Sequence, residues 1–330
     1  SLGLGPIVGG VLIDSIGWRA VFWINVPVGV LAFVLAAVFV PESRAPHARR
    51  LDPVGQVLVI ALLGGLTFAI IEAPRAGWLS AQTGIAFALA ALAAVALGRY
   101  EPRRREPLID LRFFRSVPFT GATVIAICGF AGFAGFLFLS SLYLQEVRGL
   151  SPLVAGCCFL PLAIMTLILA PLSGRMVGNR GPRLPLLLAG SLLTLGGVLL
   201  HSLSASESYV WVIGSFAVFA AGFGLLNAPI TNTAVSGMPR ERAGVAAAVA
   251  STSRQVGAAL GVAVIGSVVT ASLSGPLRSG FVAASAAGWW VITGCGLAVF
   301  VLGALTTGRR ADASAARTAR LVAEEPAFAD

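Results

Sequence analysis

Charged residues divide this sequence into ten long apolar stretches. Nine of the ten have at least 19 residues, and only Arg254 interrupts one of them. The hydrocarbon core of a bilayer is about 30 Å thick, and about 20 helical residues cross it. Because the core holds no water, each apolar segment must satisfy its own backbone hydrogen bonds, which a helix does. The pattern predicts an all-α integral membrane protein with ten transmembrane segments, the first too short to span. The stretches are residues 1–13, 20–41, 53–71, 76–98, 116–145, 149–174, 184–206, 208–239, 243–277 and 279–308.

Composition supports the membrane assignment and excludes several enzyme classes. Of the 330 residues 57% are hydrophobic and only 11% charged, whereas soluble domains carry roughly 25% charged residues. The chain has no lysine, which excludes a Walker lysine for ATP and a lysine Schiff base. The four cysteines and two histidines lack the spacing of a metal site, so we expect neither metal nor cofactor.

The arginines predict how the chain is oriented. Eighteen arginines lie in alternate links, at 44–50, 99–115, 175–183, 240–242 and 309–320, and the opposite links carry only Arg19, Arg75, Arg148 and Arg278. Arginine-rich links stay in the cytoplasm. We therefore expect a multi-pass protein of the plasma (inner) membrane with a cytoplasmic C-terminus. The net charge of +9 then reflects orientation in a lipid bilayer and not a nucleic-acid partner.

The first apolar stretch carries a proline among glycines. Gly5, Gly9 and Gly10 leave part of the helix surface without side chains beside Pro6. Such a surface lets another helix approach closely. Plain packing and a bending or gating role both remain open. Because the stretch opens without Met, a basic flank or a cleavage site, we expect sequence upstream.

The next stretch places an amide and a second proline inside the membrane. Asn25 and Pro27 follow the outer turn Gly17-Trp18-Arg19. An amide at that depth needs a hydrogen-bonding partner.

These two patterns, GPxxGG and GWRxxFxINxPxG, resemble consecutive helices of the 14-span drug:proton antiporters of the major facilitator superfamily. Residues 143–156 are similar to that subfamily's YLQxxxGxSxxxAG, and Arg254, Gln255, Gly257 and Gly261 fit a further pattern. The resemblance implies spans 5 to 14 of 14, with about four helices upstream.

The resemblance also implies a domain organisation. Residues 1–40 would end an N-terminal six-helix bundle, and 41–98 would be two extra linking helices. Residues 99–116 would be a cytoplasmic linker, 117–308 a C-terminal six-helix bundle, and 309–330 a cytoplasmic tail that is frayed or a short surface helix.

Residues 174–183 resemble the superfamily's cytoplasmic loop motif GxxxDRxGRR. Gly178 replaces the motif's Asp and Asn179 replaces a basic residue, so a charge latch is not expected. Contact with lipid phosphates and control of topology are the remaining roles. The matching residues are Gly174, Arg175, Gly181 and Arg183.

Arg254 is the strongest functional candidate. It lies 12 residues after Arg242, roughly 18 Å along a helix, where an arginine costs about 2.5 kcal/mol or more unless it is compensated. It could face a polar cavity, which we favour, or snorkel to an interface. Because no carboxylate of the chain matches its depth, its partner would be a ligand, a carbonyl or a residue upstream.

Other polar side chains within the spans could line a pathway or hydrogen-bond between helices. They are Gln255, Asn25, Asn227, Thr231, Asn232 and Thr233. The phenylalanines from Phe130 to Phe138 would suit bulky apolar substrates or face lipid.

The resemblance implies a secondary active transporter that exports drugs or other amphipathic small molecules against protons by alternating access. The proton gradient would replace a cofactor, and the full-length chain would act as a monomer. The proton-carrying acid would lie in the upstream helices, so residues 1–330 alone should not transport. Export of a lipid, peptide or siderophore remains an alternative. A membrane enzyme, with its site in the 99–116 link, is a remote one.

Overall fold

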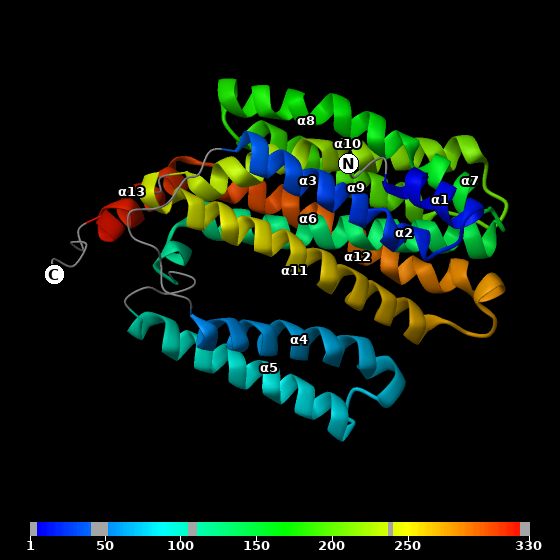
Figure 1. The fold of residues 1–330 in the computed structure, drawn as a ribbon, viewed down its shortest axis with the longest axis horizontal. Coiled ribbons are helices and arrows are strands. Elements are labelled where there is room, and N and C mark those ends of the chain that lie inside the picture. The colour runs from blue at the N-terminus through cyan, green and yellow to red at the C-terminus, as the bar shows by residue number, and fades with distance from the viewer. Residues whose placement is uncertain (1–4, 41–51, 105–110, 237–239, 324–330) are drawn as a thin grey trace.

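The computed structural model describes residues 5–40, 52–104, 111–236 and 240–323, and these residues are predominantly helical (Figure 1). Nine described helical segments are long and apolar enough to cross a membrane, and a tenth, Gly5–Ser15, is shorter. The prediction from the charge pattern is therefore confirmed. The α-helices are α1 (Gly5–Ser15), α2 (Ala20–Trp23), α3 (Asn25–Phe39), α4 (Pro53–Ala76), α5 (Ala81–Tyr100), α6 (Val117–Leu142), α7 (Pro152–Cys158), α8 (Leu160–Arg180), α9 (Arg183–His201), α10 (Tyr209–Val235), α11 (Arg240–Ser272), α12 (Leu277–Thr306) and α13 (Arg309–Ala323).

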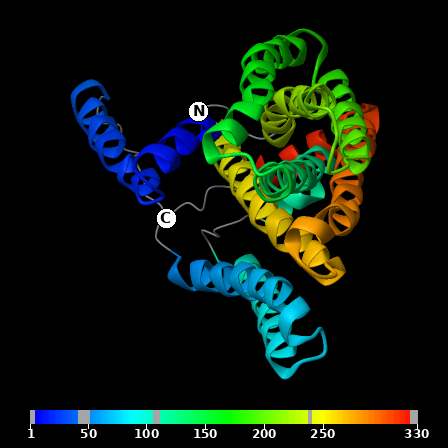
Figure 2. The same cartoon turned by 90° about the vertical axis from the view of Figure 1, so that its right-hand side faces the viewer.

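Helices α6 to α12 form one bundle, which Figure 2 shows at its end, with α6 and α10 near the middle. Stacked aromatic rings fill the contact between these two helices. The ring of Phe136 stacks on Phe219 with centroids 4.3 Å apart, and Phe133 stacks on Phe223 at 3.8 Å. All four rings are buried. The aromatic residues of α6 therefore pack mainly into the protein interior.

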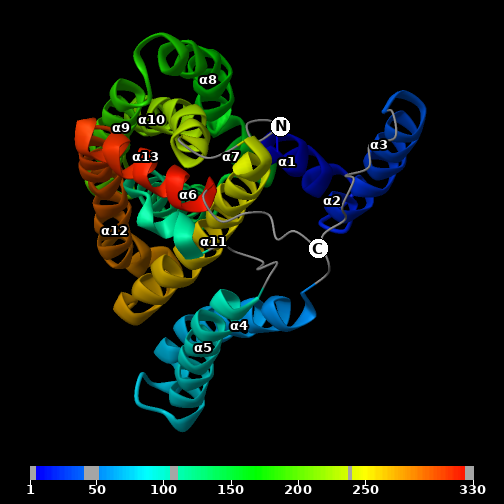
Figure 3. The same ribbon diagram turned by 90° about the vertical axis from the view of Figure 1, so that its left-hand side faces the viewer.

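Two smaller groups of helices lie on one side of this bundle (Figures 2 and 3). The first, α1 to α3, meets the bundle where α1 packs on α7, and α3 buries none of its residues. The second is the hairpin of α4 and α5, in which α4 packs on α11. The hydroxyl of Ser267 in α11 donates to the carbonyl of Ile70 in α4 at 2.6 Å.

Asp52 caps the start of α4. Its carboxylate accepts the Gly55 N–H at 3.0 Å and the Tyr100 hydroxyl at 3.0 Å, and lies 3.9 Å from the Arg104 guanidinium. The Gly55 bond first, and then Tyr100 and Arg104, hold the pKa of Asp52 below its ordinary value. The charged cap therefore joins the start of α4 to the end of α5.

The stretch 149–174 belongs to one segment of membrane-span length, Pro152–Arg180, as the charge pattern predicts, but this segment consists of two helices. Helix α7 ends at Cys158 and α8 begins at Leu160, with Phe159 outside helical geometry between them. Pro161 is the physical reason, because a proline in the first turn of α8 has no N–H to continue the ladder of α7. The following link is shorter than the loop motif suggests, since α8 continues to Arg180 and only residues 181–182 separate it from α9.

The tail forms a helix that packs on the bundle. Helix α13 crosses one end of the bundle (Figure 3) and buries Ala311, Ser314 and Thr318. The Ser314 hydroxyl donates to the carbonyl of Arg115 and accepts the Val117 N–H, each at 3.1 Å. The tail is thus a docked surface helix up to Ala323, and residues 324–330 lie outside the described part.

Candidate functional site

Arg254 lies where three helices of the bundle meet. It is ten residues, roughly 15 Å, past Gly244, where the apolar span of α11 begins. Its Nη2 donates to the hydroxyl of Thr231 in α10 at 2.5 Å, and its Cζ lies 6.0 Å from the ring centre of Phe130 in α6. The Thr231 hydroxyl in turn donates to the carbonyl of Asn227 at 3.3 Å.

The charge of Arg254 has no anionic partner among the residues that the structure describes. Its side chain is half-buried, and its Nε is buried without a hydrogen-bond acceptor. A half-buried guanidinium within a span is costly unless an anion or a polar cavity compensates it. The site can therefore accept a negative group.

Three aromatic side chains lie beside the Arg254 guanidinium, and we call Phe130, Phe223 and Phe133 the aromatic wall. Phe130 is half-buried, and its ring meets the buried Phe223 edge-on with centroids 5.3 Å apart. Phe223 is fixed from behind by stacking on Phe133. The wall is therefore rigid at its base and accessible at Phe130.

The other pathway candidates do not join Arg254. Gln255 lines a cavity of about 210 Å³ between α4 and α11, with Leu63 and Thr67. Asn232 is exposed. The amide of Asn25 donates to the carbonyl of Val21 at 3.1 Å within its own helical segment. Thr231, which sequence reasoning placed among several polar residues, is the side chain that contacts Arg254.

Helices α1 and α7 lie side by side (Figure 3), and their backbones approach each other at two glycines. A Cβ added at Gly10 would lie 2.6 Å from the carbonyl oxygen of Pro152, and one at Gly156 would lie 2.5 Å from that of Pro6. Gly5 and Gly9 face open space instead. Of the GPxxGG motif, Gly10 and Pro6 therefore take part in the contact between α1 and α7. We call this contact the α1–α7 joint.

Asp14 adds a polar bond to the α1–α7 joint. Its Oδ2 accepts the N–H of Leu153, at the start of α7, at 3.0 Å. The sequence analysis did not single out Asp14. A usable signal was its position four residues after Gly10, since residues at this spacing share a helix face.

A second pair of glycines lies inside the bundle. A Cβ at Gly257 would meet the carbonyl oxygen of Ile127, and one at Gly261 would meet that of Ala131. The glycines of α11 therefore press its backbone against α6, a contact that we call the α6–α11 seam. Pro27 lies in the first turn of α3, which buries no residue.

The loop-motif residues lie at the α8–α9 connection. Gly174 and Arg175 are within α8, Gly181 ends this helix with a φ of +78°, and Arg183 begins α9. Arg175 and Arg183 are exposed and make no ion pair with the described residues. This placement leaves both arginines available to solvent or lipid headgroups.

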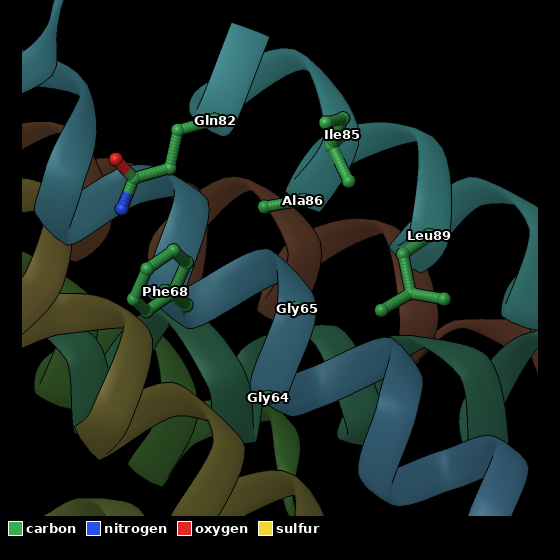
Figure 4. Close-up of a pocket in the computed structure, with 7 residues that line it drawn as sticks. All are labelled: Gly64, Gly65, Phe68, Gln82, Ile85, Ala86 and Leu89. Atoms are coloured by element: carbon green, nitrogen blue, oxygen red, sulfur yellow. The ribbon is translucent and has the colours of Figure 1, made fainter.

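A larger groove lies between α4 and α5 and has different chemistry. Figure 4 shows it between Gly64 and Gly65 on one side and Ile85 and Leu89 on the other, with a volume of about 610 Å³. Gln82 is its one polar lining side chain. An open apolar groove of this kind suits lipid chains better than a charged ligand.

Comparison with known proteins identifies the family. Residues 1–262 match the family model described as Major Facilitator Superfamily. The chain is 38% identical over 274 residues to the Multidrug resistance protein Stp of Mycobacterium tuberculosis, covering 83% of this chain and 51% of that protein. It is 38% identical over 268 residues to the Tetracenomycin C resistance and export protein of Streptomyces glaucescens, covering 81% and 50%.

A third relative is the Multidrug efflux pump LfrA of Mycolicibacterium smegmatis, 34% identical over 273 residues, with 81% of this chain and 53% of that protein covered. The chain spans about half the length of these curated relatives. The family match covers well over half of the chain and agrees with the helical fold described above. The chain therefore belongs to the major facilitator superfamily.

Proposed function

We propose that this chain is part of a secondary active transporter that exports drugs or other amphipathic small molecules in exchange for protons. The relatives named above as resistance, export and efflux proteins support this activity. Because the chain spans about half of their length, we assign the activity to the full-length protein, which we call the full encoded chain, and not to residues 1–330 alone.

The α1–α7 joint is the observation that carries the mechanism. Alternating access requires two helix groups that rock against each other around a site near the middle of the membrane. The α1–α7 joint brings α1 to α3 against the bundle of α6 to α12 through glycine backbones, with one side-chain bond from Asp14. A contact with so few interlocking side chains can open at low cost. Arg254 supplies a polar site within the bundle.

The proposed orientation has the C-terminus in the cytoplasm. The link between α8 and α9, the start of α6 and helix α13 lie at one end of the bundle (Figure 1). Together with the residues that flank this link and precede α6, these segments carry nine of the 14 described arginines of the cytoplasmic set, at 112, 115, 175, 180, 183, 309, 310, 317 and 320. Arg44, Arg49, Arg50 and Arg105 lie outside the described residues. The positive-inside bias supports a bacterial plasma membrane.

Proton coupling is assigned to an acid outside these 330 residues, and the protein is expected to work as a monomer without a cofactor. The carboxylates within the described spans lie towards helix ends, such as Glu72 near the end of α4, and not beside Arg254. Residues 1–330 alone should therefore insert into liposomes and fail to move a dye. Dye movement by residues 1–330 in response to a pH gradient would contradict this assignment.

The experiment uses inside-out membrane vesicles that contain the full encoded chain. An imposed pH gradient, acidic inside, should drive uptake of the fluorescent cation rhodamine 123, and a protonophore should stop it. Vesicles without the protein are the control. If neither rhodamine 123 nor the anionic dye fluorescein is taken up above the control in response to the gradient, proton-coupled export of this class is refuted.

A further inference from the structure

We propose that Arg254, Thr231 and Phe130 form a binding site for the acidic group and the attached ring of an anionic aromatic substrate. The inference rests on the proposed transport function and deepens it, because it names the substrate class that the polar site selects. The site combines the Arg254 guanidinium, the Thr231 hydroxyl and the half-buried ring of Phe130.

Charge gives the first reason. Arg254 is half-buried within an apolar span, and the described residues provide it with a neutral hydroxyl and an aromatic face but no carboxylate. A cation in such a place binds an anion much more strongly than it would in water, because the surroundings screen the charge less. A cationic substrate would meet repulsion at the same point.

Hydrogen bonding gives the second reason. A guanidinium has five N–H donors in a planar fork that matches a carboxylate or sulfonate. Among the described residues Thr231 accepts from Nη2, and the Thr231 hydroxyl proton is directed to the carbonyl of Asn227. Thr231 thus holds the guanidinium in place while the remaining terminal donors can bind an acidic group. We regard Thr231 as a positioning residue.

The aromatic wall gives the third reason. The Phe130 ring centre lies 6.0 Å from the Arg254 Cζ, so a ring packed on Phe130 can carry an acidic substituent to the guanidinium. Ring pairs are favourable at centroid separations of about 4.5–7 Å. Phe223 and Phe133 support Phe130, because both rings meet it edge-on and are themselves stacked on each other. A flat acid fits this arrangement better than a flexible one.

The test compares two dyes with the same xanthene ring system and opposite charge. Fluorescein is an anion and rhodamine 123 is a cation at neutral pH. Their binding to the purified full encoded chain is measured by fluorescence anisotropy in detergent. The variants are Arg254→Gln, Arg254→Lys and Thr231→Val. Arg278→Gln is the matched control, because it removes one arginine from an exposed position at the start of α12.

The fluorescein Kd should rise about tenfold or more in Arg254→Gln, as expected when one charged hydrogen-bonding partner is lost. The rhodamine 123 Kd should stay the same or fall, because this variant removes a charge that repels a cation. Arg254→Lys keeps the charge without the fork, and Thr231→Val keeps the arginine without its anchor, so each should weaken fluorescein binding about threefold. Arg278→Gln should change neither Kd.

Three results would overturn the inference. They are a fluorescein Kd unchanged in Arg254→Gln, an equal loss of both dyes in that variant, and wild-type protein that binds rhodamine 123 and not fluorescein. The proposed transport function fails separately, if wild-type vesicles show no gradient-driven movement of either dye. Equal melting temperatures of Arg254→Gln and wild type, by tryptophan fluorescence, ensure that the comparison concerns folded protein.

Discussion

Two contacts in this protein are built from glycine and differ in what surrounds them. At the α6–α11 seam, Gly257 and Gly261 bring α11 against the backbone of α6. At the α1–α7 joint, Gly10 and Gly156 do the same for α1 and α7. In both places the absence of side chains lets the backbones touch, which is how small residues favour helix association in membranes.

The neighbours of the two contacts differ. Near the α6–α11 seam, Ala263 and Ile265 of α11 are 4% and 0% exposed, because α6 and α12 also pack against this helix. Around the α1–α7 joint, Val8 and Val11 of α1 are 42% and 45% exposed, and Gly10 is the only buried residue of α1. Within residues 1–330, the α6–α11 seam is therefore one part of a large interface, whereas the α1–α7 joint is most of the contact between α1 to α3 and the bundle.

Glycine spacing alone therefore does not decide whether a helix contact is rigid. The same backbone approach is permanent when other helices enclose it and separable when they do not. We therefore assign the α6–α11 seam to the framework of the bundle and the α1–α7 joint to movement.

Gly261→Ala should destabilise the bundle most. The added Cβ would press on the carbonyl oxygen of Ala131, and overpacking of this kind costs about 1–3 kcal/mol. The free energy of unfolding can be measured by titration with a denaturing detergent. Gly294→Ala is the matched control, since a Cβ there meets nothing within 4 Å and should leave stability unchanged or slightly raised. Equal stabilities of the two variants would remove the framework role of the α6–α11 seam.

Gly10→Ala should impair transport more than stability. Its Cβ would lie 2.6 Å from the Pro152 carbonyl oxygen, and α1 can relieve this clash by moving away. We expect the efflux rate to fall about tenfold, corresponding to about 1.4 kcal/mol, with an unfolding free energy close to wild type. Gly9→Ala, on the adjacent residue with open space around it, should retain efflux. Loss of efflux in both variants would contradict a specific role of the α1–α7 joint in transport.

Asp14→Ala should have the smallest effect. It removes the acceptor of the Leu153 N–H, and an exposed bond of this kind contributes about 0.5–1 kcal/mol. The open form of the joint should become about two- to fivefold more populated. The labelling rate of a cysteine placed at Val154 reports that population, and Asp14→Asn, which keeps an acceptor oxygen, should change it less. A slower rate in Asp14→Ala would contradict the role of this hydrogen bond in holding the α1–α7 joint closed.

The sequence predicted the spans well because the distribution of charge reports directly on transfer into hydrocarbon. It did not predict the division between α7 and α8, which depends on the local effect of Pro161. It also did not predict the docking of α13, because the small buried face of Ala311, Ser314 and Thr318 has too little apolar area to stand out. Such contacts are decided by the shape of the surface that receives them.

The candidate site was predictable in part. The depth of Arg254 follows from counting residues along one helix, and its cost from the surrounding apolar sequence. Its partner does not follow, because Thr231 reaches it only through the packing of α10 on α11. For the same reason Gln255, the next residue along the chain, points to a cavity at α4 and not to the Arg254 site. Neighbours in sequence lie about 100° apart around a helix.

The most direct test of the account is a pair of distance measurements by double electron–electron resonance in the full encoded chain. One pair of spin labels spans the α1–α7 joint, at Ile13 and Val154. The other spans the α6–α11 seam, at Val124 and Val262. All four positions are exposed, and the four native cysteines are replaced first. The joint pair should show two distance populations whose ratio changes between acidic and alkaline pH, while the seam pair keeps one distance. A single unchanged distance at the joint, or an equal change at both pairs, would contradict the account.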